Sequence, residues 1–467
     1  MMGYPRVITS FFVQTRTAIM QNILILGAGR SAVSLLDYLI ERSGQNQWKI
    51  IIADANPELA KSLVGDADVE LIQLDAKNDV QRLDLISKAD LVISMLPAFL
   101  HVLVAKDCLS AGKNLITPSY VSEEMRDLDD QVKEKGLIFL NELGVDPGID
   151  HMSAMKLLDE IRAEGNEITC FESFTGGLVA PESDNNPWNY KFTWNPRNVV
   201  LAGQGGAVQF KHNGQFKYIP YQRLFRRTEI IEIPEYGRFE GYANRDSLNY
   251  RSTYGLKGIP TIYRGTLRRV GFCRAWNIFV QMGMTDDSYT IEDCPNMTHR
   301  QFTNSFLAFN QNDSVELKLM HYMKLDQDSE IIDKLKWIGI FDDKPIGLDK
   351  PSTPAQILQR ILEKKWTLDA GDKDMIVMWH KLTYKKPGEE ESKEINSSLV
   401  VIGDEGPRTA MAKTVGLPVA MAARLVLNGE FNIPGVHIPT IPELYKPIIA
   451  ELEQHGIVFK EREIENS

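Results

Sequence analysis

Three small residues after a short apolar run form a pattern that can hold the phosphates of a dinucleotide. The run 22–26 breaks into Gly27, Gly29 and Ala32 before a helical period begins. Gly27 allows a sharp turn, Gly29 lets the backbone approach a phosphate, and Ala32 lets the next helix pack closely on a sheet. The free N–H groups and positive dipole end of a helix over 30–42 would face the anion. This stretch predicts a phosphate-binding loop.

An acidic residue lies where such a loop needs a ribose-binding group. The second apolar run, 49–53, ends at Asp54, 22 residues after Ala32. A carboxylate there accepts hydrogen bonds from ribose hydroxyls and repels a 2′-phosphate, which favours NAD over NADP. The glycines alone would also fit an α/β turn without a ligand. Strand, helix and acid together favour the dinucleotide site.

The elements that would position this loop alternate along residues 21–150. Apolar runs indicate strands over 22–26, 49–53, 69–74, 90–96, 113–117 and 137–141. Helical or connecting periods lie between them over 30–42, 57–63, 79–88, 98–111 and 122–135. This alternation predicts an α/β fold, with a parallel sheet covered on both faces and ligands at the carboxyl ends of its strands.

The rest of the chain changes pattern three times. A helix over 151–163, with Asp150 as its N-cap, precedes a mostly antiparallel sheet over 167–285. Helical periods follow to about 365, including 329–340 and 353–365, and then strands over 374–385 and 397–402 around the polar loop 386–396. The helix over 409–428 is apolar on nearly all sides, so we expect it to be buried.

Composition excludes several classes of protein. The chain has 467 residues, 43% of them hydrophobic and 25% charged, with a formal net charge of −11. No apolar run is long enough to cross a membrane, and the negative charge disfavours nucleic-acid binding. The four cysteines and eight histidines show no metal-ligand spacing, so we predict no metal and expect reduced thiols in the cytoplasm.

One stretch of this acidic chain is basic. Residues 221–274 carry a net charge of +6. Such a stretch indicates either an anion-binding site or a solvated basic face.

Several motifs resemble one known family, the L-glutamate-forming saccharopine dehydrogenases. The run Asn141–His151 reads N-E-L-G-V-D-P-G-I-D-H, close to the family signature N-E-I-G-L-D-P-G-I-D-H. Further matches lie at 117–122, 176–183, 190–194, 244–247, 264–268, 337–341 and 411–418. They follow the family's order along nearly the whole chain beyond residue 20.

The resemblance implies a reaction and a domain plan. Saccharopine, NAD(P)⁺ and water would give L-glutamate, 2-aminoadipate 6-semialdehyde and NAD(P)H. A variant Rossmann dinucleotide-binding domain over 21–150 would be completed by 404–467. The substrate domain, with a mixed sheet, would take 151–284 and 374–403, and a helical insert would take 285–373. Residues 1–20 would be an N-terminal extension, either a transit-like segment or a mis-assigned start before Met20.

The resemblance also implies which residues meet the two ligands. Its cofactor contacts fall on Gly27, Ala28, Gly29, Arg30, Ala53, Asp54, Ala55, Leu74, Asp75, Met95, Thr117, Pro118, Gly144, Val145, Asp146 and Trp194. Its substrate contacts fall on Pro118, Ser119, Val145, Arg245, Thr266, Leu267 and Arg268. Saccharopine has three carboxylates, so the donor forks of Arg245 and Arg268 suit it.

Three departures from the family pattern affect these expectations. NADP-using members carry a basic residue where this chain has Asp54, so NAD is the predicted cofactor and NADP the alternative. Thr175 replaces a cysteine of the common S-Y-C-G-G run, which removes a thiol from any acid–base role. Pro118 replaces a threonine, and with it a hydroxyl and an N–H donor.

Oxidation of a secondary amine needs a group that takes the amine proton before hydride leaves. Asp146 is the first candidate, and bracing the loop before Pro147 is its alternative role. Tyr120 is the second candidate. His151 is more often structural at a helix start, and Trp194 is compatible with a plain core role.

Other functions stay open from sequence alone. A carboxynorspermidine dehydrogenase-like imine reductase would share the chemistry, but its more cationic substrate explains the basic stretch less well. A non-catalytic NAD-binding protein would need no basic pocket. At 467 residues we expect no fused lysine–ketoglutarate reductase domain. The expected partner is a small molecule, not a nucleic acid or a membrane, and a homodimer is left open.

Overall fold

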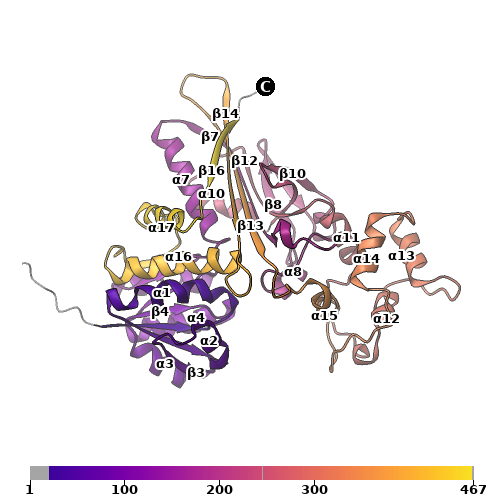
Figure 1. The fold of residues 1–467 in the computed structure, drawn as a ribbon. Helices are drawn as coiled ribbons and strands as arrows, with labels where there is room; N and C mark the ends of the chain where they lie inside the picture. The colour runs from indigo at the N-terminus through magenta and orange to yellow at the C-terminus, as the bar shows by residue number, and fades with distance from the viewer. Residues whose placement is uncertain (1–19, 245, 465–467) are drawn as a thin grey trace, which may run out of the picture.

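The first layer of the molecule is a parallel sheet. The computed structural model describes residues 20–244 and 246–464 (Figure 1). Within them, seven parallel strands follow the order β15-β6-β5-β4-β1-β2-β3. They are β1 (Gln21–Leu26), β2 (Trp48–Asp54), β3 (Glu70–Gln73), β4 (Leu91–Ser94), β5 (Asn114–Ile116), β6 (Ile138–Leu140) and β15 (Gly435–His437). The chain order reverses between β1 and β4, where a ligand crevice is expected at the carboxyl ends.

Six helices connect these strands. They are α1 (Val33–Asn46), α2 (Pro57–Val64), α3 (Asp79–Ser87), α4 (His101–Ala111), α5 (Glu123–Arg126) and α6 (Asp129–Glu134). The predicted strands are confirmed to within two residues at each end. The helical or connecting pattern predicted over 122–135 holds two short helices, α5 and α6, and the Leu128 N–H bonds the Met125 carbonyl between them.

The end of the chain returns to this sheet. Helix α16 (Ala410–Leu427) lies along α1 (Figure 1). Strand β15 pairs with β6. The buried helix predicted over 409–428 is thus confirmed, with Thr409 as its N-cap. By length and composition α16 could cross a membrane, but 72% of it is buried inside the protein, as expected for a core helix.

The last strand departs from the expected domain plan. Helix α17 (Pro442–Gln454) packs on α7 and α16. Strand β16 (Lys460–Ile464) then pairs antiparallel with β14 of the second sheet. The expectation that all of 404–467 completes the dinucleotide-binding domain is therefore wrong for 460–464.

The second sheet is mixed. Its main path is β10-β11-β12-β7-β13-β14-β16, with β8 and β9 attached through β12. Only β7 and β12 run parallel among its described neighbours. The strands are β7 (Glu167–Val179), β8 (Val208–His212), β9 (Gln215–Ile219), β10 (Thr228–Ile233), β11 (Gly237–Ala243), β12 (Thr261–Arg269), β13 (Asp374–Lys385) and β14 (Ser392–Ile402). The predicted hairpin of β13 and β14 is confirmed, although β14 begins five residues earlier because pairing continues to Lys385.

Helices of the second half of the chain extend the second sheet on one side, and helix α7 connects the first sheet to it. The helices of the second half are α8 (Pro196–Val200), α9 (Tyr221–Leu224), α10 (Tyr250–Thr253), α11 (Phe272–Met282), α12 (His299–Asn304), α13 (Val315–Met323), α14 (Glu330–Ile338) and α15 (Pro354–Trp366). Helix α7 (Ile149–Ala163) follows β6. Asp150 is not its N-cap: Gly148 holds that position, and Asp150 lies in the first turn, where its Oδ1 accepts the Gly148 N–H at 2.6 Å.

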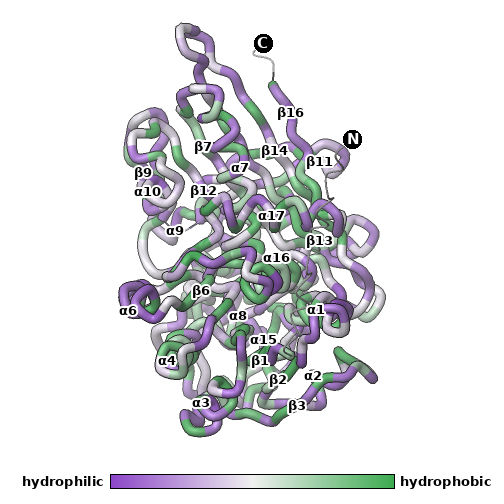
Figure 2. Tube along the Cα trace, turned by 90° about the vertical axis from the view of Figure 1, so that its left-hand side faces the viewer, coloured by the Kyte–Doolittle hydropathy of each residue, from purple (hydrophilic) through white to green (hydrophobic). Residues whose placement is uncertain are grey.

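The largest hydrophobic core lies between the two sheets. It contains buried residues of α1, α7, α16 and β13. Figure 2 shows the apolar α16 between the strands of the first sheet and those of the second. At Gly416 this helix touches the first turn of α1, where an added Cβ would lie 2.7 Å from the Leu35 nitrogen. Helix α16 thus lies directly behind the predicted phosphate loop.

We expect Gly416→Ala to lower the free energy of unfolding by about 1–3 kcal/mol, because the added methyl forces α16 away from α1. Gly44→Ala is the matched control in α1, where a Cβ meets nothing within 4 Å. It should instead raise stability by about 0.5–1 kcal/mol. Urea unfolding of both variants checks this. Equal effects of the two substitutions would contradict the close approach.

Candidate active site

The phosphate loop has the geometry that a dinucleotide requires. Gly27 has φ +90°, and a Cβ there would lie 3.2 Å from the Met95 backbone. Gly29 has open space around it, since a Cβ would meet nothing within 4 Å. Arg30 is exposed and begins the 3₁₀ turn that leads into α1, while Ala32 is buried. The loop is therefore tight where the backbone turns and open where a phosphate would lie.

Asp54 holds this loop directly. Its Oδ2 accepts the N–H of Ala28 at 2.7 Å, and its Oδ1 accepts the N–H of Asn56 at 2.7 Å. Each carboxylate oxygen has a second lone pair. Asp54 can therefore brace the loop and still accept hydrogen bonds from a ribose.

The other predicted cofactor residues of this half follow the same edge of the sheet. Ala53 is buried and its carbonyl accepts the Gly27 N–H at 2.9 Å, while Ala55 is exposed. Leu74 is buried and Asp75 exposed just beyond β3. Met95 follows β4, and its N–H donates to Leu26.

Two loops bring the predicted catalytic residues together beyond β5 and β6. Asp146 Oδ1 accepts the Tyr120 hydroxyl at 3.0 Å. Burial and the nearby Asp146 carboxylate raise the pKa of Tyr120 well above its ordinary value. Tyr120 is therefore a hydrogen-bond donor at neutral pH and a poor base.

The neighbouring residues of these loops pack closely. Thr117 and Val145 are buried, and Pro118 is half-buried. A Cβ on Gly144 would lie 3.3 Å from the Pro118 carbonyl oxygen. The two loops thus form one wall of the site.

Arg264 of β12, in the second sheet, contacts the acidic residues in and just after the second of these loops. Its Nη2 lies 3.1 Å from Asp146 Oδ1 and also forms an ion pair with Asp150. The guanidinium lies over the Tyr250 ring, 3.8 Å from its centroid. Burial lowers the pKa of Arg264, but Tyr250, Asp146 and Asp150 raise it further, so the net shift is upward. Asp146 Oδ2 has no hydrogen-bond partner within the described chain.

His151 is fully buried in the first turn of α7, next to Asp150 in sequence. Its Nε2 lies 2.7 Å from Glu142 Oε2, and its Nδ1 lies 2.8 Å from the Tyr254 hydroxyl. Burial lowers the pKa of His151, but the Asp150 and Glu142 carboxylates raise it above its ordinary value. With both ring nitrogens bound to protein groups, this geometry favours the structural reading of His151.

Arg268 lies on the same strand but has a different environment. Residues two apart on a strand share a face, so Arg264, Thr266 and Arg268 point to the same side of β12. Arg268 is buried among the rings of Tyr190, Tyr242 and Phe272, at 5.0, 5.7 and 5.4 Å from their centroids. No described carboxylate forms an ion pair with it.

Unpaired polar atoms belong to this arginine and to the tyrosine beside it. In the described chain, Arg268 Nε and the Tyr190 hydroxyl are buried without a hydrogen-bond partner, and so is the Thr193 hydroxyl nearby in sequence. Buried polar groups are nearly always paired, so these atoms indicate a place for an anionic or polar ligand. Thr193 lies beside Gly177, where a Cβ would meet its Oγ1 at 2.8 Å.

The remaining predicted residues differ in what they can contribute. The Leu267 side chain is fully buried in the second core, so only its backbone could meet a ligand. Trp194 is 40% exposed, which is unlike a core tryptophan. Thr175, in place of the family's cysteine, is buried on β7 beside Thr266. Arg245 lies outside the described residues.

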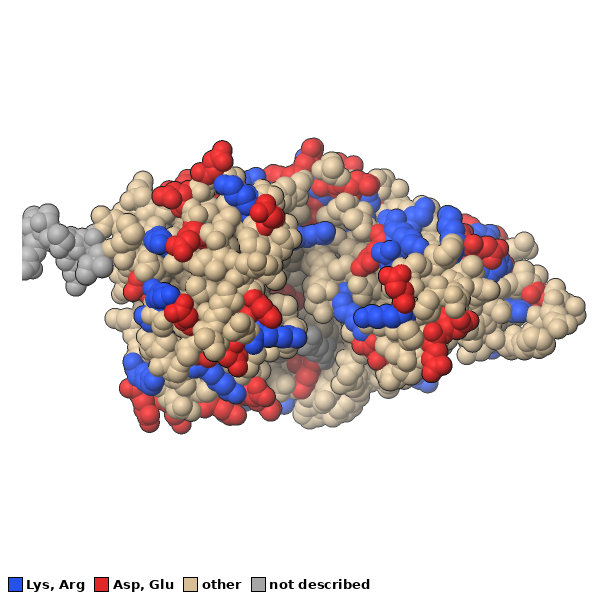
Figure 3. All heavy atoms as spheres, turned by 90° about the horizontal axis from the view of Figure 1, so that it is seen from below, with Lys and Arg blue, Asp and Glu red and all other residues tan. Residues whose placement is uncertain are grey.

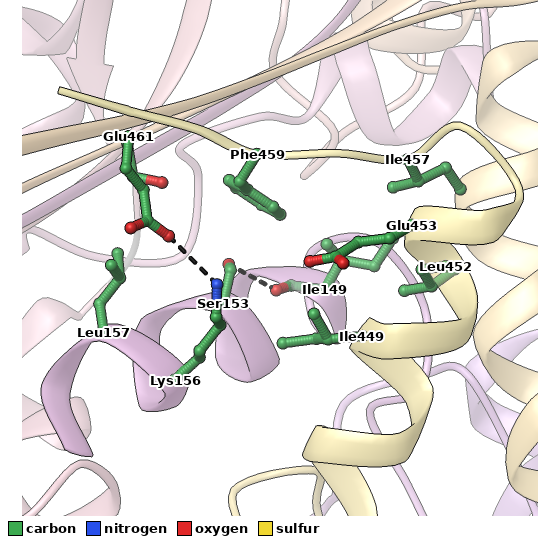
Figure 4. A pocket seen from close by; sticks show the side chains of 11 residues that line it. Ile149, Ser153, Lys156, Leu157, Ile449, Leu452, Glu453, Ile457, Phe459 and Glu461 are labelled. Carbon is green, nitrogen blue, oxygen red and sulfur yellow. Dashed lines mark hydrogen bonds and ion pairs between the residues drawn. The ribbon is translucent and has the colours of Figure 1, made fainter. Parts of the chain in front are cut away.

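A hollow separates the lobe that carries the first sheet from the lobe that carries the helical insert (Figure 3). A separate small pocket lies between α7, α17 and β16 (Figure 4). Its walls are mainly aliphatic, the Lys156–Glu461 ion pair spans one side, and it contains none of the predicted site residues. The candidate active site is therefore the group of residues at the carboxyl ends of the strands of the first sheet together with the arginines of β12, joined to it by the contact of Arg264 with Asp146.

The side chains that could bind a metal ion do not cluster in the described part of the molecule. The described residues contain no group of three or more His, Cys, Asp or Glu side chains that could hold an ion. The four cysteines are unpaired. Burial raises the pKa of Cys170 to about 12, with a further contribution from Glu172.

Comparison with known proteins decides the family. A family model described as the saccharopine dehydrogenase NADP binding domain matches residues 23–140, and one described as the saccharopine dehydrogenase C-terminal domain matches residues 144–457. This chain belongs to the saccharopine dehydrogenase family. The resemblance read from the motifs and the predicted enzyme class, an oxidoreductase, are thereby confirmed.

Individual relatives agree with this assignment. The chain is 33% identical to the NADP⁺, L-glutamate-forming saccharopine dehydrogenase of Schizosaccharomyces pombe, over 96% of this chain and 100% of that protein. It is 34% identical to the mitochondrial alpha-aminoadipic semialdehyde synthase of Rattus norvegicus, where it spans 47% of that protein. The apo saccharopine dehydrogenase structure from Saccharomyces cerevisiae superposes with a TM-score of 0.86 at 29% identity, covering 95% of this chain and 100% of that one.

Sequence reasoning missed the residue that connects the site. Arg264 was part of a matched motif, yet no site role was assigned to it. Its spacing of two residues from Thr266 and four from Arg268 on a predicted strand was the available signal. Its partners Asp146 and Asp150 lie more than 100 positions away, at separations of 118 and 114 residues, so no local pattern could reveal them.

We expect Arg264→Met to lower the free energy of unfolding by about 3–5 kcal/mol, because it leaves Asp146 and Asp150 without their cationic partner. Arg268→Met is the matched control on the same strand, and its loss should be clearly smaller, since Arg268 forms no ion pair with a described acid. Urea unfolding at neutral pH measures both. Equal losses would show that the ion pairs of Arg264 do not hold the site together.

Proposed function

We propose that this protein oxidises saccharopine with NAD⁺ and water to L-glutamate and 2-aminoadipate 6-semialdehyde. One observation supports this most: Asp146 lies between the dinucleotide edge of the first sheet and the arginine-bearing face of β12. Family membership supports the same reaction class. Arg268 is buried and forms no ion pair with a described acid, which suits a substrate with several carboxylates.

The chain's own residues fit the cofactor. Gly27 and Gly29 would hold the pyrophosphate, Asp54 the ribose, and Thr117, Gly144 and Val145 the nicotinamide side. When bound, NAD⁺ accepts a hydride from the substrate carbon beside the secondary amine.

Asp146 is the proposed base. Its Oδ1 is fixed by Tyr120 and Arg264, which leaves Oδ2 to take the amine proton before hydride leaves. Once that proton passes to solvent, the same carboxylate can deprotonate the water that attacks the resulting imine. Tyr120, which stays protonated, donates a hydrogen bond to Asp146 and holds its orientation. Arg268 would bind a substrate carboxylate inside its ring of aromatic side chains.

The preference for NAD⁺ rests on Asp54. The Schizosaccharomyces pombe relative is named as an NADP⁺ enzyme, so the proposed preference for NAD⁺ differs from that relative and is argued from Asp54 alone. A second phosphate beside the Asp54 carboxylate would place two negative charges in contact. Asp54 is also fixed by two backbone N–H groups, so it cannot turn away without releasing the loop.

We expect purified protein to reduce NAD⁺ with saccharopine at a kcat/KM at least about tenfold above that with NADP⁺, or about 1.4 kcal/mol. Asp54→Ser keeps an acceptor for the Ala28 N–H and should shift this ratio towards NADP⁺. Asp66→Asn removes a fully exposed acid outside the predicted cofactor contacts, so it is the control and should leave the ratio unchanged. Absorbance of the reduced cofactor gives the rates. An NADP⁺ preference in the unmodified protein would refute the role of Asp54, and no turnover with either cofactor would refute the proposed reaction.

We expect Asp146→Asn to lower kcat by about 10²- to 10⁴-fold and to remove the acid-side limb of the pH–rate profile, because the amide cannot take a proton. Its Oδ1 can still accept from Tyr120 and Arg264, so both ligands should still bind. Asp150→Asn, which changes the other partner of Arg264, should cost stability with a much smaller loss of kcat. A near-normal kcat with an unchanged acid limb in Asp146→Asn would leave Asp146 only a bracing role.

The compartment is a further proposal. Four unpaired cysteines, three of them buried, support a reducing environment such as the cytoplasm. A homodimer is compatible with the family but carries no argument here.

A further inference from the structure

A buried histidine lies under the turn that carries Thr117, Pro118 and Ser119. His101 is the first residue of α4 and is 3% exposed. Its Nε2 lies 2.8 Å from Ser119 Oγ and 3.0 Å from Thr117 Oγ1, and its Nδ1 lies 2.9 Å from Ser94 Oγ. One imidazole thus joins three hydroxyls at the carboxyl ends of β4 and β5.

The surroundings keep this imidazole neutral. Burial lowers the pKa of His101 to about 4, with no charged neighbour contributing. A neutral imidazole has one N–H and one acceptor nitrogen, so it exchanges single hydrogen bonds with hydroxyls and carries no charge to the site. Its contribution is therefore one of orientation.

Ser119 is the outermost hydroxyl of this chain of contacts. It is half-buried, whereas Ser94 and Thr117 are buried, and its carbonyl accepts the Glu142 N–H at 3.0 Å. Pro118 has no N–H to stabilise the turn, and the Ser119 N–H reaches Thr117 Oγ1 only at 3.4 Å. The imidazole supplies the shortest side-chain contact that the turn receives.

We propose that His101 is a positioning residue for saccharopine oxidation, which fixes the Ser119 hydroxyl in the orientation that binds a polar group of the substrate. This inference rests on the proposed function. His101 acts through Ser119 and does not touch the substrate. Its Nε2 side carries the effect, while its Nδ1 contact with Ser94 only anchors the ring.

Two substitutions separate the two ring nitrogens. The amide of glutamine reaches the position of Nε2, and that of asparagine reaches only the position of Nδ1. We expect His101→Asn to lower kcat/KM for saccharopine by about 10- to 100-fold, the factor that loss of one buried hydrogen bond corresponds to. His101→Gln should stay within about threefold of the unmodified enzyme, since it restores that bond.

A double-mutant cycle tests the route through Ser119. In a Ser119→Ala background, His101→Asn should cause little further loss, because its partner is already absent. His299→Asn is the matched control: His299 is also 3% exposed and bonds the Gly339 carbonyl, but it lies in the helical insert. It should cost stability without changing kcat/KM for saccharopine. Thermal unfolding of every variant separates loss of fold from loss of positioning. If His101→Asn fails to fold, Ser119→Ala alone decides: a kcat/KM for saccharopine within about threefold of the unmodified enzyme overturns the inference.

The outcomes are distinct. Rescue by glutamine together with a non-additive cycle supports the inference. Equal losses in the asparagine and glutamine variants, or additive losses with Ser119→Ala, overturn it. If the unmodified protein does not oxidise saccharopine, the proposed function fails and this inference fails with it. An active enzyme with additive losses overturns this inference alone.

Discussion

The buried ion pairs of Arg264 with Asp146 and Asp150 are the interaction on which the site depends. Removing three charges from water costs several kcal/mol per ion, and only close mutual contact offsets that cost. Arg264 therefore has one stable position, between the two carboxylates and against the Tyr250 ring. Because Arg264 belongs to β12 and both acids follow β6, this contact fixes the second sheet against the dinucleotide-binding sheet. The same ion pairs thus fix both the orientation of the proposed base, Asp146, and the position of one sheet relative to the other.

A second connection acts from the opposite end of the chain. Asp374, the first residue of β13, accepts the N–H groups of Ala410 and Met411 and so caps α16. That helix then packs at Gly416 against the start of α1, directly behind the phosphate loop. Displacing the second sheet would therefore pull on the loop that receives the cofactor. The cofactor loop and the substrate strand are positioned by the same body of protein.

Much of this arrangement could be predicted from local pattern. The first sheet follows from alternating apolar runs, and Asp54 follows from its spacing to Ala32. The buried helix 409–428 follows from apolar residues on every face. The errors share a physical origin, because a partner distant in sequence contributes to each of them. Asp150 has the sequence pattern of an N-cap, but its carboxylate binds the Gly148 N–H and Arg264 instead. Strand β16 follows the first domain in sequence, but it pairs with the edge strand β14 of the second sheet. The protonation of Tyr120 likewise depends on Asp146, which only the fold brings within 3.0 Å.

The two arginines of β12 explain how one strand can serve both structure and recognition. Arg264 and Arg268 share a face and are both buried, so hydrophobicity and strand period treat them alike. The two arginines differ in the charged groups that the rest of the chain places in contact with them. Two protein carboxylates neutralise Arg264, so a substrate anion gains little by approaching it. Around Arg268 the described chain supplies aromatic faces, the Leu267 carbonyl and the charge of Glu240 on the neighbouring strand, but no carboxylate in ion-pair contact. The guanidinium of Arg268 therefore keeps donor capacity that Arg264 has already spent on protein acids, and this difference is what suits Arg268 to the carboxylate of a substrate.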